Sequence, residues 1–310
     1  MMKMPAAAQL AVLLRRIPPS TPRNLWLLTA GVVAFHNLWV IHATQEATAL
    51  LVFSLLCWWG ALTCMEDRLE SLRPHPSRSG MVLGTLVLAW CLIRSSLILD
   101  RDAVIYALAP LEVISLALLC VPIRQIRAFW HQIVILSLVP LSLIGQNIYP
   151  ERLLSVTTAT MASILLSVVG FDVTTNERVV TISRVASVSV LKACSGYEQI
   201  AQVISIAIIF LLAFPLQDLR NKTSVLALAP VIAIVSNTFR VALLTLIIYA
   251  QALTGSENQW WFDFFHDGEG SLVFSGIAVC IFSWFYLKVL DKELGPPPPP
   301  TRPSFTPLDR

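Results

Sequence analysis

Charged residues are scarce in this sequence, and their scarcity excludes an ordinary soluble domain. Asp, Glu, Lys and Arg make up only 13% of the 310 residues, whereas 56% are hydrophobic and the mean hydropathy is positive. Soluble globular domains contain about 25% charged residues. The composition therefore predicts a polytopic membrane protein and not a protein with a soluble core.

Cysteines at metal-binding or disulfide spacings are also lacking. Because no CxxC or Cys/His ligand spacing occurs, we expect no disulfide, no metal and no cofactor. A cleavable signal peptide is not expected either, since Arg15, Arg16 and a proline pair interrupt the first apolar run. Five of the six cysteines lie in apolar runs, where a cysteine behaves as a small hydrophobic residue: Cys57, Cys64, Cys91, Cys120 and Cys280.

Long apolar runs are what the sequence does contain. A hydrocarbon core of roughly 30 Å takes about 20 helical residues. Eight runs approach that length: 25–43, 46–65, 81–99, 103–123, 131–149, 198–217, 223–250 and 271–290.

The basic residues between these runs predict the orientation of the chain, because Lys and Arg favour cytoplasmic loops. We therefore expect both termini in the cytoplasm, and residues 150–197 and 251–270 on the external side. The basic residues lie before the first run, after the second, after the fourth, after the sixth and at the end of the last: Lys3, Arg15, Arg16, Arg23, Arg68, Arg73, Arg78, Arg124, Arg127, Arg220, Lys222, Lys288 and Lys292.

A ninth apolar stretch, 152–169, has both ends on the external side in this topology, so it should not cross the membrane. Its apolar residues recur at helical spacing with Ser and Thr between them. We predict a helix in the outer leaflet; a ninth span with one misassigned loop is the alternative. Residues 171–190 are β-branched, with a turn near Asn176 and Glu177. The expected fold is an all-α membrane protein of about eight spans, with this amphipathic helix and a small external β element.

The sixth cysteine, Cys194, differs from the other five because it precedes the run that begins near Glu198. Polar residues surround it, among them Lys192 and Ser195. The N-terminus of a helix favours an anion, so a thiolate is stabilised there. We interpret Cys194 as a candidate nucleophile; the alternative is one more apolar cysteine.

Two later polar residues can serve the same external site. Arg240 lies inside an apolar span, where an arginine costs about 2.5 to 3.5 kcal/mol. Asn237 stands one turn earlier, and together they could donate to an oxyanion. A structural ion pair is the alternative, of the kind we predict between Arg94 and Glu112. His266 follows an aromatic cluster at the membrane interface and could transfer a proton, although an interfacial histidine often has no catalytic role.

Three motifs in this order resemble the exosortase/archaeosortase family of membrane transpeptidases. They are Ala193-Cys194-Ser195-Gly196, Ser236-Asn237-Thr238-Phe239-Arg240 and His266-Asp267-Gly268-Glu269-Gly270. The likeness covers roughly residues 150–290, while the first five spans match only in number and hydrophobicity. The residues around His266, through Gly270-Ser271-Leu272-Val273-Phe274, are similar to the cyanobacterial branch. We therefore distinguish an N-terminal bundle (1–149), a catalytic core (150–290) and a proline-rich cytoplasmic tail (291–310).

The resemblance implies a thiol protease and transpeptidase of the bacterial plasma membrane, with its active site on the external face. The catalytic residues would be Cys194, Arg240 and His266, supported by Asn237, Ser195 and Gly196. Substrates would be secreted proteins ending in a PEP-CTERM-type sorting signal: a short motif, a transmembrane helix and a basic tail. The partners that the resemblance implies are these substrates and membrane lipid. It does not imply binding to nucleic acid.

Two other functions stay open at this point. An intramembrane serine protease could use Ser195 with His266, and a transporter could use Arg240 and Glu112 as a charged pathway. The first lacks a surrounding serine-protease pattern beyond one glycine. The second lacks the broken helices expected of inverted repeats.

Overall fold

A computed structural model describes residues 22–44, 48–70, 72–97, 102–255, 259–266 and 268–295. Three features of the sequence lie outside these residues: the first basic residues (Lys3, Arg15 and Arg16), Asp267 of the histidine motif, and the proline-rich tail from Pro296. The chain divides into two compact units. The first runs to Leu154 and includes Asp267–Leu272, and the second comprises Ser155–His266 and the chain from Val273.

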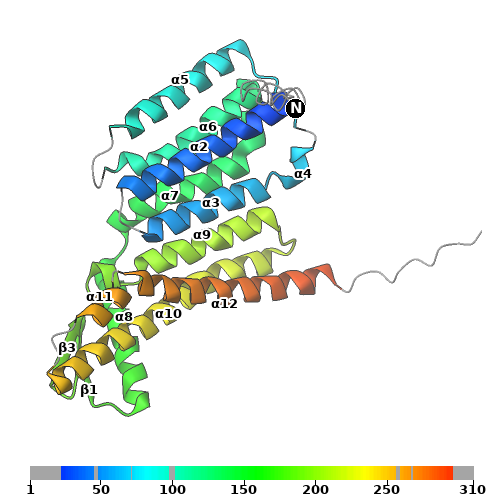
Figure 1. The fold of residues 1–310 in the computed structure, drawn as a ribbon. Coiled ribbons are helices and arrows are strands. Elements are labelled where there is room, and N and C mark those ends of the chain that lie inside the picture. Colours follow the sequence, from blue (N-terminus) through cyan, green and yellow to red (C-terminus); the bar gives the residue numbers. More distant parts are fainter. Residues whose placement is uncertain are drawn as a thin grey trace, which may run out of the picture. The chain divides into compact units, whose positions relative to one another are not determined.

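The first unit is a bundle of apolar helices in which α6 packs against α2, α5 and α7 (Figure 1). Helix α5 approaches α6 closely because Gly80 and Gly84 are spaced as in a GxxxG motif, which lets helix backbones meet in membranes. A Cβ on Gly84 would lie 3.1 Å from the carbonyl oxygen of Ser115, whose hydroxyl donates to Gly84 O at 2.8 Å. The elements are α2 (Pro22–Thr44), α3 (Thr48–Thr63), α4 (Glu66–Leu69), α5 (Arg78–Ser95), α6 (Val104–Cys120), the 3-10 helix η1 (Ile123–Phe129) and α7 (Trp130–Ile148).

The charged residues inside this bundle pair differently from the prediction. Arg94 donates to Asp102, just before α6, and not to Glu112. The backbone N–H of Val104 and the Arg94 guanidinium hold the pKa of Asp102 below its usual range. Glu112 is fully buried, with Oε1 3.3 Å from Nδ1 of His36. The predicted Arg94–Glu112 pair is therefore wrong, because each residue has a partner that helical spacing along neighbouring runs did not reveal.

The second unit combines long helices with a small sheet (Figure 1). Strands β1, β2 and β3 form an antiparallel sheet in that order, with Val173 opposite Ile182 and Ile182 opposite Ala186. The predicted β element is thus confirmed, and Glu177 sits in its first turn with φ 48°. The elements are α8 (Glu151–Val169), β1 (Val173–Asn176), β2 (Val179–Ile182), β3 (Ala186–Ser189), the 3-10 helix η2 (Lys192–Cys194), α9 (Tyr197–Ala213), α10 (Leu219–Thr254), α11 (Trp260–His266) and α12 (Glu269–Leu294).

The core of this unit forms where the sheet meets α10. Val180 and Ile182 of β2 are buried, while Val179 and Thr181 are less so, as expected for a strand with one face against a core. Both β2 and β3 pack on α10, and α9 packs along it. Ala159, Ala162 and Leu166 of α8 complete the same cluster.

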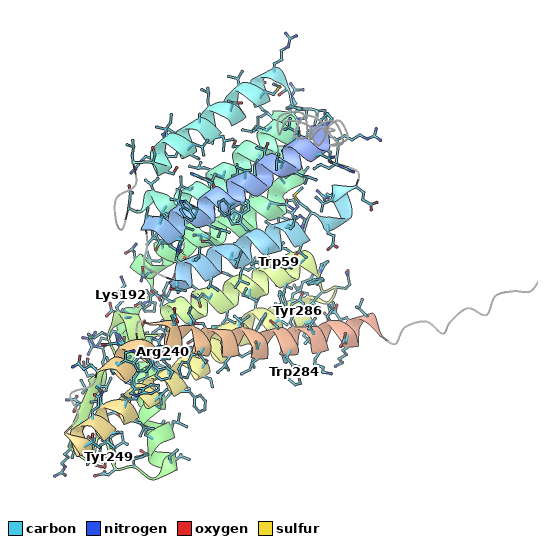
Figure 2. All side chains as sticks on the ribbon, viewed as in Figure 1. Trp59, Lys192, Arg240, Tyr249, Trp284 and Tyr286 are labelled. Atoms are coloured by element: carbon cyan, nitrogen blue, oxygen red, sulfur yellow. The ribbon has the colours of Figure 1, made fainter. Side chains whose placement is uncertain are left out.

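The protein is an all-α polytopic membrane protein with a small sheet. Among the described residues six helical segments are long and apolar enough to cross a membrane, and α3 and α6 are shorter apolar helices. Side chains that face outward agree with a lipid environment: Trp284 of α12 is 62% exposed, whereas Tyr286 on the same helix is buried and donates to Phe214 O (Figure 2). The six segments are Pro22–Thr44, Ile123–Ile148, Glu151–Val169, Lys192–Ala213, Leu219–Thr254 and Glu269–Leu294.

Four helices differ from the expected spans: α3 and α6, which are shorter than a full span, and α8 and α5. Helix α8 meets the length and hydropathy expected of a span, so its placement in the outer leaflet stays a prediction. Helix α5, which was expected to cross, is not among the apolar segments, because Arg78 and Arg94 lie at its two ends.

Candidate active site

The segment that carries Cys194 is a tight turn between the sheet and α9. It forms one turn of 3-10 helix, with the Cys194 N–H donating to Leu191 O at 2.9 Å. The chain then enters α9 through Gly196, whose φ of +92° is in the left-handed region that favours glycine. A Cβ there would also lie 2.7 Å from Nδ2 of Asn237. Gly196 is therefore needed for both the turn and the close approach of α10.

Three consecutive carbonyl groups of this turn accept hydrogen bonds from three different side chains. Arg240 Nη2 donates to Ala193 O at 3.0 Å, and Asn237 Nδ2 donates to Cys194 O at 2.9 Å. Thr158 Oγ1 of α8 donates to Ser195 O at 3.1 Å. Because two helices hold successive peptide groups, the backbone on both sides of the Cys194 side chain is fixed. We refer to these three contacts as the carbonyl clamp.

Thr158 is a member of this clamp that sequence reasoning did not single out. It counted only as one of the polar positions of the amphipathic stretch 152–169. In the structure it is almost fully buried, next to Ala159 of the core cluster. The sequence does show that Thr158 shares a helical face with small residues. A single sequence cannot show whether such a face is buried or exposed to solvent.

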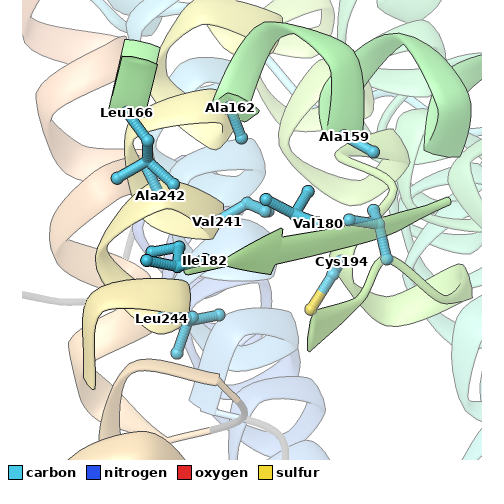
Figure 3. Close-up of a cluster of buried hydrophobic side chains, with 10 residues drawn as sticks. Ala159, Ala162, Leu166, Val180, Ile182, Cys194, Val241, Ala242 and Leu244 are labelled. Carbon is cyan, nitrogen blue, oxygen red and sulfur yellow. The ribbon is translucent and has the colours of Figure 1, made fainter. Parts of the chain in front are cut away.

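The Cys194 side chain is 2% exposed and borders the apolar core of the second unit. Figure 3 shows it below α8 and beside β2, with Val241 of α10 and Val180 nearby. This position at the start of α9 agrees with the sequence expectation. Its burial means that a substrate would reach the sulfur only through a small local opening of the turn or of neighbouring side chains.

Arg240 is half-buried, and it carries a hydrogen-bond donor for which the described part of the chain offers no acceptor. Its Nε is buried and has no hydrogen-bond partner within the described residues. Neither of the two ion pairs found in that part of the chain includes Arg240. The predicted alternative, a structural ion pair, therefore has no identified carboxylate. A buried guanidinium N–H without an acceptor is costly, and an anionic oxygen would satisfy it.

Asn237 makes a contact that the sequence did not reveal. Its amide nitrogen donates to the Cys194 carbonyl, and the residue is fully buried. Its expected role as a second donor to an oxyanion stays a prediction. Asn237 therefore supports the turn that carries Cys194. Its neighbour Ser236 extends this support, because Gln199 Nε2 donates to Ser236 Oγ at 3.1 Å and Ser236 Oγ donates to Phe274 O at 2.8 Å.

His266 ends helix α11, which packs on α10 in the same unit as Cys194 and Arg240. Its ring stacks on Phe262, with centroids 5.0 Å apart and an interplanar angle of 16°. Phe262 and Phe265 pack against the cluster that contains Cys194. The aromatic helix thus places the partly exposed imidazole beside the core that holds the thiol, while Trp260 and Trp261 are exposed.

One residue of each alternative function is engaged in other contacts. The Ser195 hydroxyl donates to Lys192 O at 2.7 Å and accepts from the Tyr197 N–H at 3.5 Å, so it bonds within its own turn. Glu112, the acidic partner in the transporter interpretation, is bonded to His36 within the first unit. No group of three or more His, Cys, Asp or Glu side chains suited to a metal ion occurs among the described residues.

Comparison with known proteins gives one family. The family model for transmembrane exosortases matches residues 39–283 of the chain. No curated protein and no solved structure matches. The matched region contains the Cys194 turn, Arg240, His266 and most of the first unit as well.

Proposed function

Because the chain belongs to the transmembrane exosortase family, we propose that it is a membrane cysteine peptidase and transpeptidase that cleaves, and transfers, secreted proteins carrying a C-terminal PEP-CTERM-type sorting signal. Cys194 is the nucleophile, Arg240 stabilises the oxyanion and His266 is the acid and base. The family supports a transpeptidase that acts on sorting signals. The likeness to the cyanobacterial branch remains a prediction.

The carbonyl clamp is the observation that supports this assignment most strongly. One guanidinium both fixes the peptide group before Cys194, through Nη2, and keeps a buried Nε without an acceptor. Donors that are fixed before the reaction are the main means of stabilising an oxyanion in acyl transfer. A residue that only neutralised a charge would not need this bond to the nucleophile turn.

The proposed reaction proceeds in two acyl transfers. The Cys194 thiolate attacks the scissile carbonyl carbon, and the resulting oxyanion is stabilised by Arg240. The C–N bond then breaks, the leaving amine takes a proton from His266, and the acyl group remains as a thioester on Cys194. An acceptor amine or water gives its proton to His266, attacks the thioester and releases the thiolate.

The decisive test compares Cys194→Ala with Ser195→Ala on a secreted reporter that ends in a sorting signal. Cys194→Ala should abolish processing, a loss of at least about 10³-fold, at normal membrane abundance. Ser195→Ala should lower it only a few-fold, since it removes one neutral hydrogen bond worth about 1 kcal/mol. Recovery of a hydroxylamine-sensitive reporter adduct from wild-type membranes supports the thioester. Normal processing by Cys194→Ala would instead make Ser195 the candidate.

The orientation is proposed as well: the nucleophile turn faces the outside of the plasma membrane, and both termini are cytoplasmic. Cysteines placed at Asn176, an exposed strand residue, and at Arg73, an exposed loop residue, test it. An impermeant maleimide on intact spheroplasts should label the first and spare the second until the cells are lysed. The reverse pattern would invert the topology and remove the external active site.

A further inference from the structure

The first unit contains an apolar groove that plays no part in the proposed chemistry. It lies between α2 and α3, with α6 and α7 at its floor, and encloses about 510 Å³. Three indole rings line it, those of Trp26, Trp58 and Trp59. Two of them have their N–H groups engaged, by Leu116 O and by Asn37 Oδ1. These two therefore present only ring faces and edges to an occupant.

One polar side chain interrupts this lining. Gln132 is 4% exposed, and its Nε2 donates to Ala61 O at 3.3 Å. Its Oε1 is buried and has no hydrogen-bond partner within the described residues. A buried acceptor is costly when it is left unsatisfied. The lining of the groove thus includes one polar side chain whose unsatisfied acceptor is covered by protein atoms.

The end of the groove next to α4 is charged. Arg68 Nη1 donates to Ala128 O at 2.7 Å, beside the groove residue Phe129, and Arg23 Nη1 donates to Glu70 O at 3.3 Å, beside the groove residue Leu69. The exposed residues Glu66 and Glu70 belong to the same end. Gln132 lies less than one helical turn beyond Phe129, so the unsatisfied acceptor is also at this end.

We propose that this groove binds one phospholipid whose headgroup carries both a phosphate and a primary ammonium. One acyl chain lies among the tryptophans, the phosphate is held by Arg23 and Arg68, and the ammonium lies beside Glu66 and Glu70. A charged end on an apolar groove matches the two parts of such a molecule. This site lies wholly in the first unit and does not depend on the proposed peptidase activity.

The size of the groove favours a lipid chain over a helix of another protein. An α-helix with its side chains is about 10 to 12 Å wide and rises 5.4 Å per turn, so a volume of this size holds about one turn. A membrane-spanning helix would therefore not enter the groove as a whole, whereas a single acyl chain is much thinner and can lie along it. Oxygens of the phosphate can accept from both guanidinium groups, which suit phosphate geometry.

Two glycines provide a matched steric test. Gly31 lines the groove and Gly276 lies on α12; both are exposed, and a Cβ on either would meet no atom within 4 Å. Native mass spectrometry of the purified full chain in detergent, with added phosphatidylethanolamine, should show one bound lipid. Gly31→Trp should weaken that binding at least about tenfold by filling the groove, and Gly276→Trp should leave it unchanged. Equal binding by the two variants would overturn the groove as the site.

Charge variants test the headgroup. Arg68→Glu should weaken binding about tenfold, as loss of a charge-assisted hydrogen bond does, whereas Arg73→Glu makes the same charge change in the neighbouring loop without effect. Arg23→Glu repeats the test if Arg68→Glu does not elute as a monodisperse protein. If neither arginine substitution weakens lipid binding, the assignment of the phosphate to Arg23 and Arg68 is contradicted. Phosphatidylglycerol with the same chains should bind more weakly, and equal binding would contradict the role of Glu66 and Glu70.

Discussion

The two units of this protein use their buried and half-buried polar side chains in different ways. In the first unit titratable side chains pair with one another across helices: His36 with Glu112, and Arg94 with Asp102. In the second unit three polar side chains donate to the backbone of a single turn. Pairing between side chains satisfies a charge wherever two helices meet. Donation to consecutive carbonyl groups fixes one short segment in space, and that segment carries Cys194.

The comparison implies that matched substitutions in the two units should have similar effects on stability and unlike effects on the rate of processing. Two of the pairs, an arginine pair and an asparagine pair, take one residue from each unit, and the third compares two threonines of the second unit. The three pairs follow from the largest expected effect on rate to the smallest.

Arg240→Lys and Arg94→Lys form the first pair. Lysine keeps the charge but lacks the planar guanidinium with several donors. Arg240→Lys should lose about a hundredfold in rate, as loss of one oxyanion donor does elsewhere, because the Nε donor and the bond to Ala193 O disappear together. Arg94→Lys should process the reporter normally, since an ammonium still pairs with Asp102. Turnover and membrane abundance are measured together for both; near-normal turnover by Arg240→Lys would leave that residue with a structural role only.

Asn237→Ala and Asn37→Ala form the second pair, because both side chains are fully buried and each makes one interhelical hydrogen bond. Each change leaves a partner unsatisfied and should cost about 1 to 3 kcal/mol of stability. Only Asn237→Ala should also slow processing, by about tenfold, because the Cys194 peptide group is released. Thermal unfolding in detergent gives the first quantity and reporter cleavage the second. A similar slowing in both variants would mean that stability alone governs the rate.

Thr158→Val and Thr245→Val form the third pair. Both threonines are buried; Thr158 donates to Ser195 O, whereas Thr245 donates to Val241 O within its own helix. Valine keeps the shape and removes the hydroxyl. We expect Thr158→Val to lower turnover about threefold to tenfold, the equivalent of about 1 kcal/mol for one neutral hydrogen bond, and Thr245→Val to change it less than twofold. The ratio of the two turnover numbers, measured at equal abundance, decides whether α8 supports the turn.

Some elements of the fold followed from local pattern alone. The all-α membrane class, the β element over 171–190 and its turn at Glu177 were predicted and are confirmed, because hydrophobic period and β-branching are local properties. The family was also predicted from three short motifs and is confirmed over residues 39–283. The motifs could be recognised from the sequence because the residues of each motif are contiguous in the chain.

The sequence did not predict which polar side chains and backbone groups bond to one another. The Arg94–Glu112 pair was wrong because several side chains within reach of a helix face compete, and spacing along one helix does not rank them. Thr158 was missed for a related reason, since its hydrogen-bond acceptor, Ser195 O, lies 37 residues away in the sequence. Asn237 was predicted as a supporting residue, but its bond to the Cys194 carbonyl was not predicted.

The sequence by itself determined that the chain spans a membrane, where its sheet forms, and which family its motifs represent, since composition, periodicity and contiguous motifs need no knowledge of distant contacts. Tertiary structure alone decided which donor meets which acceptor. The Arg240 bond to Ala193 and the buried Nε arise only when α10 packs beside the Cys194 turn, and Gly196 makes room for that packing. Hydrogen bonds act over about 3 Å, so their pattern depends on how the helices dock and not on the order of residues along them.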